Sequence, residues 1–342
     1  MIRIAVDAMG GDNAPGELVK GAVDAVNRKD DIEVLLIGRE EAVTNELKKY
    51  TCPEGRLQLI PASEVIETDE HPVNAIRSKK DSSMVVGMSL VRRGEADGFV
   101  SAGNSGALLV GGQTIVGRIK GVERAPFGAL IPTTKGVALL LDAGANVDAR
   151  PSHLVQFARM GSIYMEHVVG LSRPRVGIVN IGTEEEKGNA LVKETFPLLK
   201  ACTDIHFTGS IEARDIPYGG ADVIVCEAFT GNVILKMYEG VGGALLGLMK
   251  EGLMSSLRSK LGALLIKPAL KETFKTFDAS RYGGAPMLGL RGLVVKTHGN
   301  SKAVDVTQSI LQCATFHEQG INEKIKESLD AGKGEQAAEN QI

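Results

Sequence analysis

The sequence lacks several residue types and patterns that mark common functional classes. It contains no tryptophan, and aromatic residues make up only 4% of its 342 residues, so surfaces that stack on nucleic-acid bases are not expected. The formal net charge of −3 provides no overall field that favours nucleic acid. The four cysteines lie far apart and form no CxxC motif, so we expect no zinc cluster and no other metal site.

Longer patterns are missing as well. No apolar stretch approaches the ~20 residues of a membrane span, and no charged-then-apolar leader precedes the first apolar run. We therefore expect a cytoplasmic protein with reduced thiols. There is no GxGxxG after the first apolar run, no GxxxxGK(S/T), no HExxH and no GxSxG. These absences argue against a dinucleotide fingerprint, a P-loop, a zincin and an α/β-hydrolase nucleophile.

Short apolar runs and amphipathic segments alternate along the chain. The runs predict strands at residues 2–6, 33–37, 57–60, 98–100, 137–141, 176–179, 205–207 and 223–226. The segments predict helices at residues 15–26, 40–49, 105–116, 152–169, 187–200 and 233–250. Apolar strands that alternate with helices indicate an α/β fold with a mainly parallel sheet flanked by helices. A chain of this length can form one large unit or two closely joined lobes.

Five short turns rich in glycine, asparagine and serine follow apolar runs. They are DAMGGD (7–12), SAGNSG (101–106), NIGT (180–183), FTGN (229–232) and HGNS (298–301). Ligands of parallel sheets bind at the carboxyl ends of the strands, and backbone N–H groups at helix starts attract anions. The placement of these turns therefore predicts one shared site for an anion, and we expect a phosphate.

Within these turns and the DAGAN segment (142–146), glycines and side-chain donors are the candidate phosphate or substrate contacts. They are Gly103, Asn104, Ser105, Gly106, Asn146, Asn180, Thr183, Asn300 and Ser301. An alternative role for Asn104 and Thr183 is to cap the helix that follows. Lys187 is expected to place a cation near the phosphate, and Asn232 and His298 are the candidates for stabilising an oxyanion or the leaving group.

Carboxylates in the same loops have a different expected role, because a carboxylate next to a phosphate is unfavourable. We interpret Asp7, Asp12 and Asp142 as organisers of their loops. Glu227 is an acid or base candidate, but a lone glutamate after a strand is more often structural.

Seven motifs, taken in order, resemble the bacterial PlsX family of phosphate acyltransferases. They are DAMGGD, SAGNSGA, LDAGAN, NIGTEEEKG, the TGN of EAFTGN, GGAPMLG and HGNS. The resemblance runs from about residue 2 to about residue 326, and seven weak motifs in sequence are together highly specific. Two departures are Glu227-Ala228, where the family often has Asp-Gly, and Asn300, where it often has serine.

The resemblance implies transfer of a long-chain acyl group from acyl carrier protein to inorganic phosphate, by direct attack of bound phosphate on the thioester. The acyl phosphate would feed phosphatidic acid synthesis through a membrane glycerol-3-phosphate acyltransferase. The implied fold is similar to the isocitrate/isopropylmalate dehydrogenase-like and phosphotransacetylase group, as a homodimer without NAD or another cofactor. Alternatives are a phosphate acetyl- or butyryltransferase that uses coenzyme A, a decarboxylating dehydrogenase and a membrane-bound scaffold without activity.

Residues 251–271 form a basic amphipathic segment that protrudes from this pattern, with Pro268 interrupting it. Its candidate contact residues are Leu253, Leu257, Arg258, Lys260, Leu261, Leu264 and Leu265. The segment suits a core or dimer interface, an acidic carrier protein or, as the resemblance implies, peripheral binding to the inner face of the cell membrane. We expect one catalytic domain over residues 1–330, a docking segment at 240–280 within it and a flexible tail at 331–342.

Overall fold

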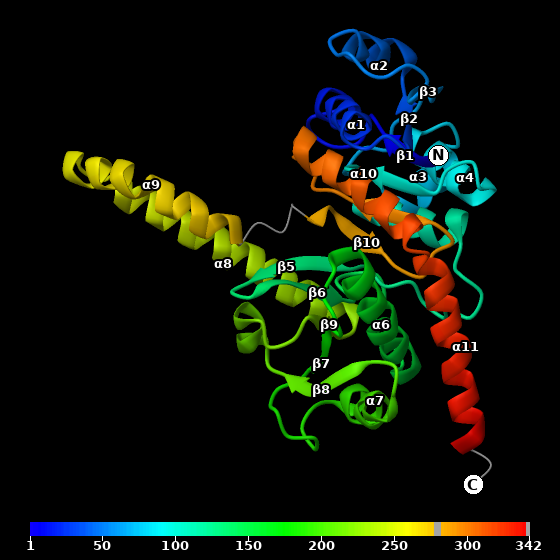
Figure 1. The fold of residues 1–342 in the computed structure, drawn as a ribbon, viewed down its shortest axis with the longest axis vertical. Helices are drawn as coiled ribbons and strands as arrows, with labels where there is room; N and C mark the ends of the chain where they lie inside the picture. The colour runs from blue at the N-terminus through cyan, green and yellow to red at the C-terminus, as the bar shows by residue number, and fades with distance from the viewer. Residues whose placement is uncertain (277–281, 340–342) are drawn as a thin grey trace.

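Two β-sheets form the centre of the protein, and helices cover them (Figure 1). The structure is a computed structural model, and it describes residues 1–276 and 282–339. The first sheet contains β1 (Ile2–Asp7), β2 (Ile32–Gly38), β3 (Leu57–Pro61), β4 (Gly98–Ser101), β10 (Ala285–Met287) and β11 (Leu293–Lys296). The second contains β5 (Ala129–Thr133), β6 (Gly136–Leu141), β7 (Arg175–Val179), β8 (His206–Ile211) and β9 (Val223–Val225).

The helices follow the strands in an alternating order. They are α1 (Gly16–Arg28), α2 (Glu40–Leu47), α3 (Pro72–Ser78), α4 (Ser83–Arg93), α5 (Ser105–Gly111), α6 (Pro151–Tyr164), α7 (Ala190–Ala201), α8 (Ala228–Met254), α9 (Leu257–Thr276), α10 (Ala303–Glu318) and α11 (Ile321–Glu339). Short π-helical or 3-10 turns occur at Gly112–Val116, Met165–Val169 and Ala213–Tyr218.

The first sheet has the order β10-β11-β4-β1-β2-β3 and is parallel except for β10. Successive residues of β1 face opposite sides of the sheet. Ile4 and Val6 belong to the same apolar cluster as residues of α1 and α10. Ala5 belongs to the cluster that contains Met84 and Met88 of α4. Both faces are thus buried, which explains why the parallel strands are apolar throughout.

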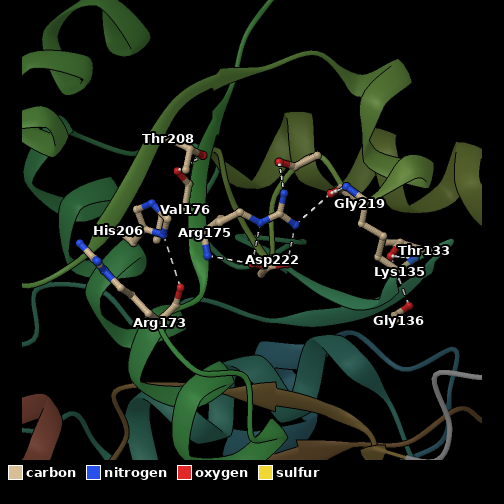
Figure 2. A network of polar contacts seen from close by, with 11 residues as sticks. Thr133, Lys135, Gly136, Arg173, Arg175, Val176, His206, Thr208, Gly219 and Asp222 are labelled. Atoms are coloured by element: carbon tan, nitrogen blue, oxygen red, sulfur yellow. Dashed lines mark hydrogen bonds and ion pairs between the residues drawn. The ribbon is translucent and has the colours of Figure 1, made fainter.

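The second sheet has the order β5-β6-β9-β7-β8 and is parallel except for β5. At its amino edge Arg175 donates from Nη2 to Oδ1 of Asp222 over 2.8 Å, and the Arg175 backbone N–H donates to Oδ2 over 2.8 Å (Figure 2). The same guanidinium reaches the carbonyl oxygen of Gly219. This contact joins β7 to the start of β9, so the opposite, carboxyl ends of these strands remain available for a site.

α8 and α9 form a helical hairpin that projects away from both sheets (Figure 1). The prediction divided this region near residue 250, whereas the structure places the break at Ser255 and Ser256. Ser256 Oγ accepts a hydrogen bond from the backbone N–H of Ser259, which caps the start of α9. Pro268 lies inside α9 rather than at its end. No helix in the described part of the chain is long and apolar enough to cross a membrane.

The predicted α/β class is confirmed, and the strands expected from apolar runs are present, but in two sheets. Sequence patterns did not predict the antiparallel edge strands β5 and β10, nor the helices α3, α4, α10 and α11. α7 begins at Ala190 rather than Lys187, because Asn189 accepts a hydrogen bond from the N–H of Val192 and caps the helix there. α11 runs through most of the predicted tail and packs against α6, which lies between it and the second sheet (Figure 1).

Candidate functional site

A polar cavity of about 500 Å³ lies where the carboxyl edge of the first sheet meets the first turns of α8. Its walls come from the start of α5, from β5, α8 and β10, and from the loop between β11 and α10. Four predicted residues line it, together with two lysines that the prediction did not include. These six residues are Ser105, Lys236, Lys296, His298, Asn300 and Ser301.

The sheet itself brings the two main loops of this cavity together. β4 and β11 are parallel neighbours, with Lys296 paired to Ser101. The loops that follow them therefore leave the sheet at the same edge, as ligand-binding loops of parallel sheets do. Ser105 is the first residue of α5, and Lys296 is the last residue of β11. A side chain from each loop can thus reach the same ligand.

Lys296 is the most unusual side chain in the cavity. Its Nζ atom donates to the carbonyl oxygen of Ala102 over 3.2 Å and also to that of Thr297. Burial lowers the pKa of Lys296 to about 8, although the nearby carboxylates of Asp7 and Asp12 act in the opposite direction. Among the described residues no carboxylate pairs directly with it. The ammonium form of Lys296 therefore still has a proton available for a ligand in the cavity.

Lys236 and His298 lie at the rim of the cavity, next to the same carboxylate. Lys236 Nζ lies 2.9 Å from Oε2 of Glu239, and His298 Nε2 lies 3.9 Å from Oε1 of the same carboxylate. The His298 side chain is 77% exposed, so the ring is free to turn toward a ligand. Glu239 thus lies beside both side chains and balances part of the charge of Lys236, while Lys296 lies deeper.

The three glycine loops of the first sheet are held together by hydrogen bonds. Ser101 Oγ donates to Oδ2 of buried Asp7 over 2.7 Å, and the N–H of Gly103 donates to Ser101 Oγ over 3.0 Å. The N–H of Asp12 donates to the carbonyl of Gly299 over 2.7 Å. Burial raises the pKa of Asp7, while the hydrogen bonds that it receives oppose this effect. These contacts agree with the expected organising role of Asp7 and Asp12.

The side chain of Asn104 is occupied by hydrogen bonds to the protein backbone. Its Oδ1 accepts the N–H of Ala107 over 2.9 Å and caps α5. Its Nδ2 donates to three backbone carbonyls, of Glu67, Thr68 and Glu70, at 3.0 to 3.1 Å. Gly103 and Gly106 are packed tightly: a Cβ on Gly106 would lie 2.4 Å from a ring carbon of Pro72. The capping alternative therefore describes Asn104, and neighbouring Ser105 faces the cavity.

Asn146 is likewise part of a buried structural cluster around Asp142. The Asp142 carboxylate accepts the N–H groups of Phe127, Gly144, Ala145 and Asn146 at 2.9 to 3.1 Å. Asn146 Nδ2 donates to Asp142 Oδ2 over 2.6 Å and to the carbonyl of Ala125 over 3.0 Å. Both amide protons of Asn146 are thereby taken, and Asp142 has the loop-organising role expected for it.

The loop after β7 does not line this cavity. Asn180 Nδ2 donates to the carbonyl of Lys187 and to Ser210 Oγ, both over 3.1 Å. Lys187 Nζ pairs with Glu184 over 2.8 Å at the surface, and this hydrogen bond raises the pKa of Lys187. Thr183 is exposed nearby. Of the five turns expected to share one pocket, those at 101–106 and 298–301 line the polar cavity, those at 180–183 and 229–232 contribute to a second cavity, and the turn at 7–12 lines neither.

Asn180 lines a second, mainly apolar cavity of about 350 Å³, bordered by β7, α7 and α8. The two cavities lie on different sides of α8, since Val233 and Ile234 face the apolar one and Leu235 and Lys236 face the polar one. The helix is therefore a shared wall, fixed at its start by Glu227. That carboxylate accepts the N–H of Phe229 over 2.6 Å, which is the structural role expected for it.

Asn232 lies one helical turn before Lys236 on α8, so the two share a face of the helix. Its Nδ2 donates to the carbonyl of Ala143 over 3.2 Å. The prediction missed Lys236 and Lys296 because neither is part of a glycine turn. One signal was present in the sequence: Lys296 ends an apolar strand directly before the HGNS turn.

Comparisons with known proteins identify the family of the chain. A family model described as "Fatty acid synthesis protein" matches residues 2–324. A phosphate acyltransferase of Desulfitobacterium hafniense (strain Y51) is 50% identical over 330 residues, which cover 96% of this chain and 98% of the relative.

Two solved structures have a similar fold. The EutD phosphotransacetylase from Staphylococcus aureus superposes with a TM-score of 0.60 at 17% identity, covering 92% of this chain and 93% of the other. A putative 4-hydroxythreonine-4-phosphate dehydrogenase from Salmonella typhimurium gives a TM-score of 0.50 at 12% identity, covering 92% and 99%. At such low identity these two likenesses speak for the fold alone, and they confirm the fold group that the motifs implied.

Proposed function

Since the chain belongs to the bacterial family of phosphate acyltransferases and is an acyltransferase, we propose that it transfers a long-chain acyl group from acyl carrier protein to inorganic phosphate. The product is an acyl phosphate that supplies phosphatidic acid synthesis through a membrane glycerol-3-phosphate acyltransferase. Phosphate attacks the thioester carbonyl directly, because it is already an anion at neutral pH and needs orientation more than activation.

The observation that carries this proposal is the polar cavity, with Lys296 at depth and Lys236 and His298 at its rim. A dianion taken partly out of water needs cations and hydrogen-bond donors around it. Ser105, Asn300 and Ser301 supply neutral donors from two loops that leave the same sheet edge. In this proposal the phosphate lies against Lys296 with its attacking oxygen toward α8.

Asn232 is an exposed residue one helical turn before Lys236 and does not itself line the polar cavity. It remains our candidate for stabilising the oxyanion that forms when phosphate attacks. Oriented donors of this kind stabilise the developing charge of a tetrahedral intermediate. Lys187 and Thr183 remain candidates for substrate contact outside the polar cavity, because both are exposed on the loop after β7. In the same proposal Asn104, Asn146 and Asn180 support the loops rather than touch the phosphate.

The hairpin is the feature that favours a carrier protein over coenzyme A as the acyl donor. Arg258, Lys260 and Lys267 place three cations on α9, and an acidic carrier protein is complementary to them. The alternative is a phosphate acetyl- or butyryltransferase that acts on acyl-CoA. We expect acyl-CoA to be the donor if the hairpin has no part in donor binding.

The hairpin also carries a row of exposed leucines. Leu257, Leu261, Leu264 and Leu265 are each at least 65% exposed and recur at helical spacing, so they form one apolar stripe. We propose that this stripe lies on the inner face of the cell membrane, where a lipid-like product would be released. Alternatively, the same stripe forms the contact between two subunits. We propose a homodimer in either case.

Labelled phosphate tests the proposed reaction. Purified protein is incubated with [32P]phosphate and either acyl-carrier protein or acyl-CoA of the same chain length, and acyl phosphate is separated from phosphate. We expect labelled acyl phosphate with a kcat/KM at least tenfold higher for the carrier-linked donor. Equal or better use of acyl-CoA contradicts the choice of donor, and label in neither reaction contradicts the function.

A further inference from the structure

We propose that Lys296 is a catalytic residue whose amine takes the proton released by the attacking phosphate and delivers it to the departing sulfur. This inference rests on the proposed function, since it requires phosphate to attack a thioester. It is argued from the position of Nζ in the polar cavity and from the proton balance of the reaction.

The reaction moves one proton. An oxygen of HPO₄²⁻ forms a bond to the thioester carbon, and the bond from that carbon to sulfur breaks. The acyl phosphate leaves as a dianion, so the phosphate has lost its proton, and the thiolate must gain one to leave as a thiol. One group that accepts a proton from oxygen and donates it to sulfur completes the reaction without net change in the enzyme.

The hydrogen bonds of Lys296 leave one position of its amine open toward the cavity. Nζ donates to the carbonyls of Ala102 and Thr297, both of which are fixed by the strand edge. A charged lysine has three protons and a neutral one has two. With two protons on backbone carbonyls, the remaining position holds a lone pair in the neutral form and a proton in the charged form. That position is the one needed for transfer.

Other charged groups that line the cavity are less suited to this role. Lys236 and His298 both contact Glu239, and both are largely exposed. Asp305 accepts the N–H of Lys302 over 2.8 Å at the start of α10. Each of these groups has a local partner, whereas in the described part of the chain Lys296 has only the two carbonyls.

The surroundings of Lys296 hold its two protonation states close in free energy. Burial and the charge of Lys236 disfavour the ammonium, and Asp7 and Asp12 favour it, which gives a pKa of about 8. An ordinary thiol has a pKa of about 8.5. General acid–base groups work best when their pKa lies near the working pH, and a lysine in water would hold its proton too firmly.

The test separates proton transfer from simple attraction between charges. Lys296→Arg keeps a positive charge that does not titrate, and Lys296→Met removes the charge. Lys20→Arg, on the exposed face of α1, is the matched control. For each protein we measure kcat, the KM for phosphate and the pH profile with the natural alkyl thioester. We repeat the measurement with a thiophenyl thioester of the same acyl chain, whose thiolate leaves without a proton.

We expect Lys296→Arg to keep the phosphate KM within about threefold while kcat with the alkyl thioester falls about 100- to 10,000-fold, the usual range for losing general acid–base catalysis. The inflection near pH 8 in the pH profile of kcat should disappear. At least tenfold of the loss in kcat should be recovered with the thiophenyl donor. Lys20→Arg should match the wild type. A Lys296→Arg enzyme with near-normal kcat overturns the proposal, as does an equal loss with both donors.

A second measurement needs no activity. An NMR titration of protein with ¹³C-labelled lysine, assigned through Lys296→Arg, should give a midpoint near pH 8 for this side chain. A midpoint above pH 10 overturns the inference. If the wild type prefers acyl-CoA, the donor proposed above is wrong, and the same kinetic comparison made with acyl-CoA still decides the role of Lys296.

Discussion

Lys296 and Ala102 are joined by a hydrogen bond of 3.2 Å from the lysine Nζ to the backbone carbonyl oxygen, across the carboxyl edge of the first sheet. The two residues are 194 positions apart in the sequence. Parallel pairing of β4 with β11 brings them together. The contact holds the partly buried amine of Lys296 at the wall of the polar cavity.

The stability of the protein should depend on pH through Lys296. Its pKa is about 8 in the folded protein and 10.5 in the unfolded chain. Between these values the unfolded chain binds the extra proton, so the free energy of unfolding rises with pH across the window. Relative to Lys296→Met, the wild type should gain about 3 kcal/mol between pH 7 and pH 10.5. Urea unfolding of both proteins at the two pH values measures this, and a constant difference would contradict it.

Asn104 and Ser105 are neighbours with opposite expected roles. Asn104→Ala removes a helix cap and three hydrogen bonds to backbone carbonyls. It should lower the free energy of unfolding by roughly 2–4 kcal/mol. Ser105→Ala should leave stability within about 0.5 kcal/mol and raise the phosphate KM severalfold. Denaturant unfolding and phosphate titrations of both variants check this. If Asn104→Ala raises the phosphate KM and leaves stability unchanged, Asn104 contacts the phosphate.

Asn232 should act on the rate rather than on phosphate binding. Asn232→Ala removes a candidate oxyanion donor, and loss of one such donor typically raises the barrier by ~3–4 kcal/mol. We expect kcat to fall about 100- to 1,000-fold with the phosphate KM little changed. Steady-state kinetics with varied phosphate measure both constants. An Asn232→Ala enzyme whose KM rises while kcat stays normal would place this side chain at the phosphate instead.

The leucine stripe of the hairpin should decide binding to lipid. Leu257→Glu or Leu261→Glu puts a charge on a side chain that is 80% or 65% exposed, so folding should be unaffected while vesicle binding is lost. Leu198→Glu is a matched control, because Leu198 is an exposed leucine on α7, away from the hairpin. Co-sedimentation with vesicles containing anionic phospholipid is the measurement. Equal sedimentation of wild type and Leu261→Glu would reject the membrane role.

The basic residues of α9 should act on the acyl donor. Reversing Arg258, Lys260 and Lys267 to glutamate places like charges opposite an acidic carrier protein, and this should raise the donor KM at least tenfold at low salt. The phosphate KM should stay unchanged, because these residues lie outside the polar cavity. Kinetics with acyl-carrier protein at two salt concentrations test this. If charge reversal does not change the donor KM, the hairpin does not bind the carrier protein and instead contacts lipid or a second subunit.

Much of the fold could be predicted from local patterns. Apolar runs such as residues 33–37 and 137–141 became strands because a parallel sheet buried on both faces needs apolar side chains at every position. The short edge strands β5 and β10 escaped prediction, because an antiparallel partner of three to five residues leaves little periodic signal. Likewise, the break at Ser255 and Ser256 depends on a cap that local hydrophobicity does not reveal.

Part of the site could be predicted too. Ser105, His298, Asn300 and Ser301 follow strands that proved to be neighbours, so their turns meet as expected. Asn104 and Asn146 have the same residue type and the same kind of turn, yet backbone carbonyls occupy their amide protons. A donor that points to a ligand and one that points to the chain look alike in sequence.

The sequence by itself determined which segments become strands and helices, and it placed glycine and polar turns at the ends of the strands, because both follow from local periodicity and backbone freedom. Only the tertiary structure decided which turns share a cavity, since strand order depends on packing between distant segments. It also decided the chemistry of Lys296. A lysine in a sequence is an ordinary cation, and its lowered pKa arises from burial between loops that the chain brings together only on folding.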